Sequence, residues 1–105
     1  MKIETAASHL EALGNPMRLK IYWALVQAGE GGLPVGRLQE KLKIAPSTLS
    51  HHIKSLVVVG LISQERDATT LVCHTNFAVM QRLVDFLAAE CCVDAASCKQ
   101  TTNAA

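Results

Sequence analysis

The sequence predicts a mostly α-helical domain that carries one small β-hairpin. Half of the residues are hydrophobic but only 4% are aromatic, which is typical of a compact helical protein rather than an aromatic-rich sandwich. Four stretches of helical periodicity come first, two short β-type runs follow, and a last helical stretch completes the pattern. With 105 residues, the chain is expected to form one domain and to gain buried surface from a partner chain.

Apolar spacing and end signals define the first two helices. Residues 3–13, IETAASHLEAL, carry apolar side chains at helical spacing, namely Ile3, Ala6, Ala7, Leu10 and Leu13. A second helix over about residues 16–28 begins after Asn15, which can cap its start, and Pro16 suits its first position because the missing N–H costs nothing there. The glycines that follow end this helix. We expect it to bury four residues, Ile21, Ala24, Leu25 and Ala28.

The middle of the chain predicts two more helices and a hairpin. After a short extended LPV, residues 36–42 (GRLQEKL) form a brief helix, and Pro46 begins another, PSTLSHHIKSLVVVG, which ends at Gly60. LISQER and LVCHTN then read as two strands, and DATT joins them as a hairpin turn although it lacks the usual Gly.

A last helix over about residues 77–91 carries a narrow apolar seam. Its members recur at steps of three and four residues and are Phe77, Met80, Val84, Leu87 and Cys91. Such a seam is what one helix presents to another. We expect the folded domain to cover residues 1–92, and residues 93–105 to form a tail that holds a further cysteine.

Two short helices joined by a tight turn and followed by a hairpin make a winged helix-turn-helix, so the predicted order of elements is α-α-α-α-β-β-α. The fourth helix buries one side, formed by Leu49, Ile53, Leu56 and Val57. Its other side offers hydroxyl, imidazole and ammonium groups, which can contact base edges and phosphates in the major groove. A polar helix face is often simply solvated, and the order of elements is what favours DNA here. The predicted DNA-binding residues are Arg37, Lys41, Lys43, Ser47, Thr48, Ser50, His51, Lys54 and Arg66.

No enzyme constellation competes with this interpretation. The chain has no Gly-rich phosphate loop, and adjacent His51 and His52 point about 100° apart on a helix, too far to act as a metal-binding pair. His52 is expected to be a hydrogen-bonded packing residue. We therefore predict no catalytic residue and no catalytic cofactor.

Charge and hydropathy indicate which kind of partner and which cellular compartment suit the chain. Residues 1–66 hold eight Lys or Arg against five acidic residues, and residues 67–105 hold two against four, so the first part suits an anionic partner. The longest strongly apolar run, LVVVGLI, is far shorter than the roughly 20 residues of a membrane span. The start carries no pattern of a signal peptide. We expect a cytoplasmic protein with no membrane partner, whose thiols stay reduced.

Two stretches resemble a known family. LEALGNPMRLKIYWAL is similar to the second-helix signature of ArsR/SmtB-type metalloregulatory repressors, and STLSHHIKSLVVVGLI is similar to their recognition helix running into the wing. The resemblance covers about residues 8–90. It implies a homodimer, with the first and last helices at the interface, that binds an operator in double-stranded DNA and leaves it when an inducer binds.

The familiar inducer sites of that family are absent. Members that sense arsenite through the third helix carry a Cys-Val-Cys type motif, where this chain has LPVGRLQ. Members that sense zinc through the last helix carry Asp, His and Glu ligands, and FAVMQRLVDFLAAE contains no His. The wing is also less basic than is usual in the family and lacks its Gly.

Three cysteines remain as soft ligands, Cys91, Cys92 and Cys98. Three thiolates suit a trivalent, thiophilic centre such as arsenite or antimonite. CCVDAASC also resembles the C-terminal cysteine arrangement of some arsenic-responsive ArsR repressors. A continuous helix would separate Cys91 and Cys98 by about 10.5 Å along its axis. The helix must therefore end or unwind near Cys92 for one ion to bind all three.

Other interpretations of these cysteines stay open. Cys91 can be a small apolar residue of the seam, and the cluster can be a thiol redox switch. Zinc or cadmium can take three thiolates and an oxygen from Glu90 or Asp94. The chain can also be a small metal-buffering thiol protein that binds no DNA. Cys73 is expected to be a packing residue.

Overall fold

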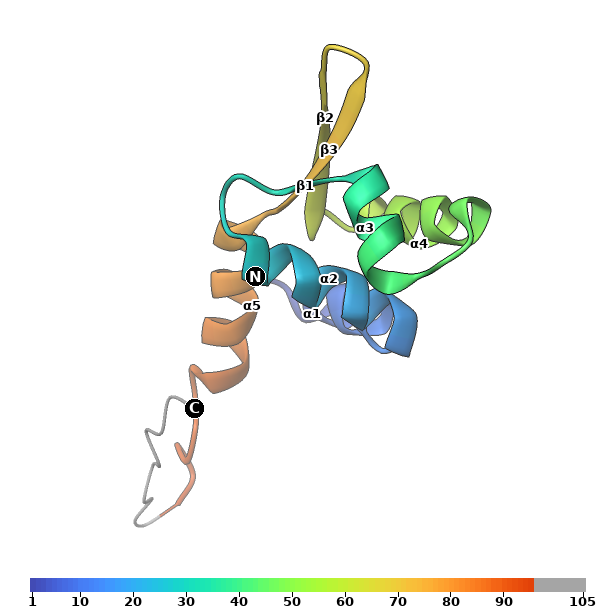
Figure 1. Cartoon of the computed structure of the whole chain (residues 1–105). Coiled ribbons are helices and arrows are strands. Elements are labelled where there is room, and N and C mark those ends of the chain that lie inside the picture. Colours follow the sequence, from blue (N-terminus) through green and yellow to red (C-terminus); the bar gives the residue numbers. More distant parts are fainter. Residues whose placement is uncertain (96–105) are drawn as a thin grey trace.

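The computed structural model describes residues 1–95, and it confirms the predicted winged helix-turn-helix (Figure 1). The predicted third helix begins one residue earlier than expected, and the last helix ends at Ala88 instead of at about residue 91. The elements are α1 (Ile3–Leu13), α2 (Pro16–Ala28), β1 (Leu33–Pro34), α3 (Val35–Leu42), α4 (Pro46–Val58), β2 (Ile62–Asp67), β3 (Thr70–Thr75) and α5 (Phe77–Ala88).

The three strands form one antiparallel sheet in the order β1-β3-β2. β2 and β3 make the predicted hairpin, which we call the wing (residues 62–75), and Ile62 pairs with Thr75 at its base. Ala68 takes a φ of 58° in the turn, where a Gly is more usual. The extended LPV stretch adds the short third strand, with Leu33 opposite Cys73. Pro34 is tolerated there because β1 lies at the sheet edge.

A glycine allows the loop before β1 to lie directly against the wing. Gly32 has a φ of 67°, and a Cβ at this position would overlap the carbonyl oxygen of Cys73 and come within 2.7 Å of His74 Nδ1. His74 Nδ1 also lies 3.0 Å from the carbonyl oxygen of Glu30. The close approach of these two backbones therefore requires a residue without a side chain at position 32.

The core lies where α2, α3, α4 and β3 meet, and its fully buried members are Ile21, Leu25, Leu38, Leu49, Leu56, Leu61 and Cys73. The predictions for Ile21, Ala24, Leu25 and Cys73 are confirmed, and burial raises the pKa of the Cys73 thiol. The prediction for Ala28 is wrong: this last residue of α2 is exposed, because Gly29 turns the chain away directly after it. Tyr22, which the sequence did not single out, is buried.

The predicted apolar stripe of α1 is divided between two faces. The residues that pack inward are Ala6, His9 and Ala12, and His9 Nε2 lies 2.9 Å from the carbonyl oxygen of Val59. Ile3 and Leu10 point outward and are 68% and 44% exposed. This outward apolar face has no cover within residues 1–95.

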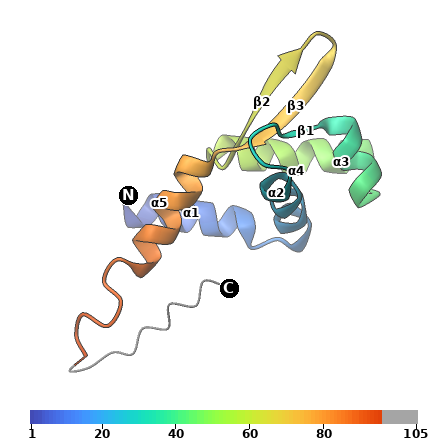
Figure 2. The same cartoon turned by 60° about the vertical axis from the view of Figure 1, so that its left-hand side comes forward.

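α5 contacts α1 and then runs away from the helical body (Figure 2). Of the residues that form α5, only Leu83 is buried. The predicted seam residues Val84 and Leu87 are 53% and 59% exposed. No helix in residues 1–95 is both long enough and apolar enough to cross a membrane.

Candidate nucleic-acid interface

The helix-turn-helix consists of α3, a three-residue turn and α4. Lys43 ends α3 in the left-handed conformation, with a φ of 55°, and its N–H donates to the carbonyl oxygen of Gln39 at 2.8 Å. Ile44 is buried in the core and anchors the turn, and Pro46 opens the next helix. The turn therefore holds α4, the candidate recognition helix, at a set angle to α3.

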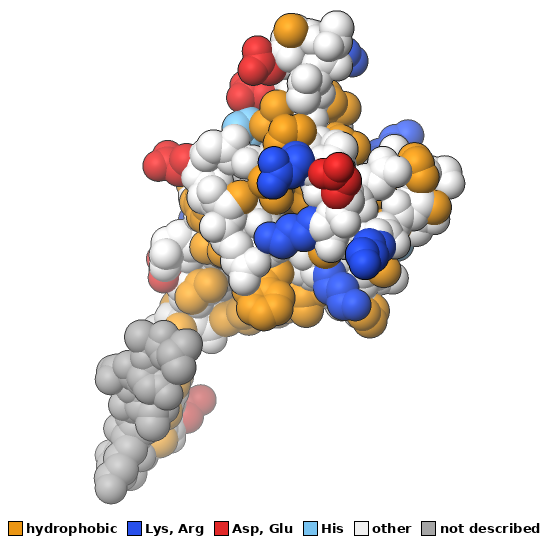
Figure 3. Space-filling model, in the orientation of Figure 1, with side chains coloured by type: hydrophobic (Ala, Val, Ile, Leu, Met, Phe, Trp, Pro, Cys, Tyr) orange, Lys and Arg blue, Asp and Glu red, His pale blue; other side chains and the backbone are white. Residues whose placement is uncertain are grey.

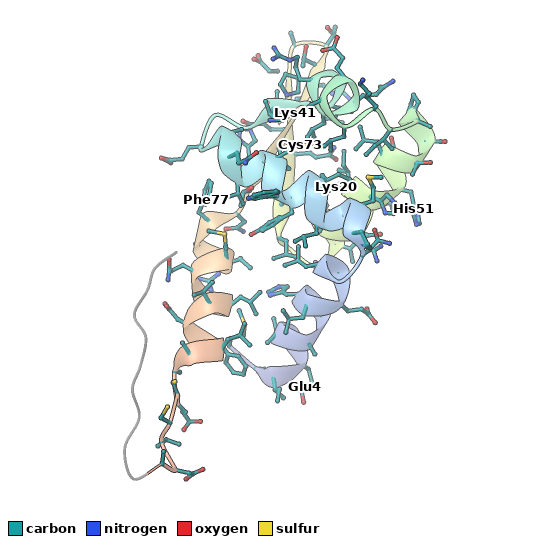
Figure 4. The ribbon with its side chains drawn as sticks, turned by 60° about the horizontal axis from the view of Figure 1, so that its bottom comes forward. Glu4, Lys20, Lys41, His51, Cys73 and Phe77 are labelled. Atoms are coloured by element: carbon teal, nitrogen blue, oxygen red, sulfur yellow. The ribbon has the colours of Figure 1, made fainter. Side chains whose placement is uncertain are left out.

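α4 buries one side and exposes the other, as predicted. Leu49, Ile53 and Leu56 are buried, and Val57 is partly buried. All five predicted DNA-binding residues of this helix are exposed, namely Ser47, Thr48, Ser50, His51 and Lys54. Within residues 1–95 none of these five side chains makes a hydrogen bond, so their polar groups are available to a partner. Figure 4 shows His51 projecting outward at the edge of the helical body, whereas Cys73 lies inside it.

The remaining predicted DNA-binding residues are also exposed. Arg37, Lys41 and Lys43 belong to α3 and the turn, next to α4. Arg37 Nε lies 3.8 Å from Glu40 Oε1, but both side chains are largely exposed, so this pair leaves the guanidinium accessible. On the face shown in Figure 3, Lys and Arg side chains spread over the helical body with one acidic side chain between them.

The wing contributes one of the predicted cations. Arg66 is exposed on β2, but it stands between Glu65 and Asp67. Glu65 Oε1 lies 2.8 Å from His74 Nε2, so this carboxylate is directed towards the base of the wing. The tip therefore offers a single cation to a phosphate backbone.

The expectation for His52 is wrong in one respect. The side chain is partly buried, as predicted, but its Nδ1 atom is buried without a hydrogen-bond partner among residues 1–95. Burial lowers the pKa of His52, and the nearby Arg18 and His51 lower it further. His52 therefore supports the helix as a neutral side chain, and its ring centroid lies 5.5 Å from that of His51 on the exposed polar face.

Sequence reasoning also missed Arg18. This residue lies in the first turn of α2, and its Nε donates to the carbonyl oxygen of Ala12 at 2.8 Å. It lines a groove together with His51 and Lys54 of α4. No local pattern links Arg18 to a helix that follows so much later in the chain, so only the fold brings these cations together.

The chain leaves the helical path before the first cysteine of the cluster. α5 ends at Ala88, and a series of turns follows, in which Cys91 N–H donates to the Ala88 carbonyl oxygen at 3.1 Å and Ala95 N–H to that of Cys92 at 3.0 Å. Cys92 has a φ of 62°. The α-helix ends at Ala88, slightly earlier than expected, and the left-handed backbone of Cys92 gives the predicted break near this residue.

Cys91 and Cys92 are both exposed, and their Sγ atoms lie 3.5 Å apart. α5 ends before Cys91, so the helical seam does not continue to this residue, and Cys91 is exposed in the single chain. Cys98, the third predicted ligand, lies outside the described residues. Within residues 1–95 no group of three His, Cys, Asp or Glu side chains is arranged to hold a metal ion, which includes Glu90 and Asp94.

A three-residue turn, an exposed polar helix and a hairpin wing within a three-stranded sheet define a winged helix-turn-helix protein. The family model described as "Helix-turn-helix domain" matches residues 13–65. The chain is 40% identical over 68 residues to the nodulation protein NolR of Rhizobium meliloti, in an alignment that covers 65% of the chain and 53% of NolR. It therefore spans about half the length of this relative.

Solved structures share the fold. NolR from Sinorhizobium fredii has a TM-score of 0.64 and 31% identity, over 83% of this chain and 84% of that one. An ArsR-like transcriptional regulator from Rhodococcus sp. RHA1 has a TM-score of 0.72 at 17% identity, over 83% and 79% of the two chains. The chain belongs to the helix-turn-helix domain family. This membership confirms the prediction that it is not an enzyme.

Proposed function

We propose that the chain is a homodimeric repressor that binds an operator through α4 and leaves it when trivalent arsenic or antimony binds Cys91, Cys92 and Cys98. The observation that carries the DNA-binding part is the exposed side of α4, where five polar side chains follow a tight turn and make no hydrogen bond or ion pair within residues 1–95. A helix of this kind suits the major groove of B-DNA.

The contacts divide into two kinds. The residues that read base edges are Ser47, Thr48, Ser50 and His51, since their hydroxyl and imidazole groups can donate and accept hydrogen bonds. The residues that neutralise phosphates are Arg37, Lys41, Lys43, Lys54 and Arg66. Binding should therefore weaken steeply as the salt concentration rises.

The dimer forms through α1 and α5. Their outward apolar residues, Ile3, Leu10, Val84 and Leu87, are exposed in the single chain, and a second copy would remove them from water. Two copies also satisfy the geometry of an operator, because two recognition helices must reach half-sites about 34 Å apart.

The inducer binds after α5. Cys91 and Cys92 are exposed and their Sγ atoms lie 3.5 Å apart, so one small ion can reach both sulfurs once Cys92, which is disulfide-bonded in this structure, has been reduced. Arsenite and antimonite bind three thiols as thiolates: each new bond to sulfur replaces one bond to a hydroxide, which takes the proton of that thiol and leaves as water. Because these residues directly follow α5, a bound ion would alter the end of the dimer helix and hence the spacing of the two recognition helices.

One experiment tests arsenite and antimonite against the other candidate inducers. An operator would first be selected from a random duplex library, and its release from the parent would then be measured with arsenite, antimonite, zinc, cadmium and peroxide. Cys91→Ser, Cys92→Ser and Cys98→Ser should each weaken release by arsenite at least tenfold, because each removes one of three ligands. Cys73→Ala is the matched control, since it removes a thiol outside the cluster.

The results separate the alternatives. If arsenite and antimonite leave every complex intact, the metalloid proposal is wrong. Release by peroxide alone indicates a thiol redox switch, and release by zinc or cadmium alone indicates a divalent-metal site. A chain that binds these ions but selects no operator is a metal buffer.

A further inference from the structure

The recognition helix is flanked by two grooves, one on each side. The groove beside the wing has a volume of about 350 Å³ and is lined mainly by α4, β2 and β3. The second, of about 450 Å³, lies between α4 and the α1–α2 corner. We call it the corner groove, and its lining residues that matter here are Ser8, Glu11, Arg18, His51, Lys54 and Ser55.

The corner groove is continuous with the candidate DNA-binding face. His51 and Lys54 belong to that face and also line the groove, and Lys54 lines the groove beside the wing as well. An α-helix in the major groove of B-DNA lies between two sugar-phosphate backbones. A strand can therefore pass on each side of α4, one towards the wing and one towards the α1–α2 corner.

The Arg18 guanidinium is fixed in the corner groove and has terminal nitrogens that could bind an anion. The bond from its Nε to the Ala12 carbonyl oxygen fixes the guanidinium, and its terminal nitrogens make no hydrogen bond within residues 1–95. Burial is the main cause of the lowered pKa of His52, and the nearby Arg18 charge lowers it further, in keeping with the position of Arg18 beside α4 in this groove. A guanidinium fixed in this way can bind a phosphate with little loss of side-chain entropy.

Other groups in the groove contribute less. The start of α2 is no anion site, since the Asn15 side chain already accepts from the N–H groups of Met17 and Arg18. The hydroxyls of Ser8 and Ser55 donate to carbonyl oxygens of their own helices. Glu11 is the one acidic residue that lines the groove, and it opposes an anion.

We propose that the corner groove binds a phosphate of the DNA strand on the side of α4 away from the wing, with Arg18 as its main ligand. The proposal rests on the proposed operator binding and adds a backbone contact from α2 to those of α3, α4 and the wing. Because phosphates carry no sequence information, this contact would position the protein on any duplex rather than select a sequence.

The test measures the Kd of the full chain for the selected operator and for an unrelated duplex over a series of salt concentrations. Arg18→Gln should weaken binding to both duplexes about tenfold at low salt, and it should reduce the slope of log Kd against log salt by about one. Lys20→Gln is the matched control, because it removes the same charge from an exposed residue of the same helix outside the groove (Figure 4).

A second pair of variants keeps the test valid if Arg18→Gln impairs folding. Arg18→Gln also loses the bond to Ala12, whereas Glu11→Gln keeps the size and helix preference of an exposed side chain. Glu11→Gln should tighten binding to both duplexes about twofold to threefold at low salt, since it removes a repulsive charge. Glu4→Gln, at the far end of α1, is its control and should have no such effect (Figure 4).

The outcomes distinguish this proposal from the proposed function. If Arg18→Gln behaves as Lys20→Gln does, or Glu11→Gln as Glu4→Gln does, the corner groove binds no phosphate, while operator binding by the parent still stands. If the parent selects no operator, both proposals are overturned. A loss confined to the operator would indicate base recognition and would also contradict a phosphate contact.

Discussion

Two residues adopt a left-handed backbone conformation in different surroundings. Gly32 and Ala68 both have a positive φ, of 67° and 58°. Ala68 is exposed at the hairpin turn, so its side chain has room and the conformation costs only about 1 kcal/mol. Gly32 has no such room, because the backbone of β3 lies against it. The missing turn Gly therefore did not prevent the hairpin, whereas position 32 does need a Gly.

Gly32→Ala should destabilise the fold by about 2–4 kcal/mol, because the new Cβ overlaps the Cys73 carbonyl oxygen and also strains the backbone. The measurement is the free energy of unfolding in urea. Gly31→Ala is the control, since a Cβ there meets no atom within 4 Å and the φ is not positive. Equal stability of the two variants would contradict the account of the β1–β3 contact.

At the scale of elements, apolar periodicity predicted the helices but not which face of each is covered. In α1 the inward positions hold Ala6, His9 and Ala12, and two larger apolar residues point outward. Periodicity also failed to predict the end of α5, because FLAAECC contains neither Gly nor Pro and so carries no strong stop signal. β1 was not predicted as a strand, since two residues are too few for a pattern to be visible.

The outward face of α5 provides a prediction about assembly. Val84→Glu should convert the dimer into monomers at micromolar concentration, because it places a charge in the proposed apolar interface. It should also weaken operator binding by at least tenfold. Sedimentation equilibrium measures the mass and a binding titration measures the Kd.

Ala78→Glu supplies the control for that variant. It adds the same charge to an exposed residue in the first turn of the same helix, where an acidic side chain is favourable. This variant should remain dimeric. A Val84→Glu chain that also remains dimeric would rule out the α5 face as the interface.

At the scale of the whole molecule, the two proposed sites lie on different parts of an elongated chain, with extents of 56 × 26 × 23 Å. α4 and the wing belong to the helical body, while Cys91 and Cys92 follow α5 where it leaves that body (Figure 1). α5 also lies in the proposed dimer interface, so an inducer bound after it can act on DNA binding through the arrangement of two chains. This position is the physical reason for assigning the coupling to the dimer.

The sequence predicted the order of the elements and the polar side of α4, because both depend on local spacing and end signals. It did not predict the corner groove, which depends on how α1 and α2 pack against α4. Arg18 and Lys54 become neighbours only through the buried contacts of His9 and the core. Such long-range placement has no counterpart in a local pattern.

The central claim is that the exposed side of α4 reads a DNA sequence, and the ratio of operator affinity to unrelated-duplex affinity tests it most directly. The parent should bind the selected operator at least a thousandfold more tightly at physiological salt. The double variant Ser50→Ala and His51→Ala should lower operator affinity about tenfold to a hundredfold and change binding to the unrelated duplex little. Gln27→Ala, at an exposed position of α2, should change neither. Equal affinity of the parent for both duplexes, or a double variant that behaves as Gln27→Ala does, would contradict the claim.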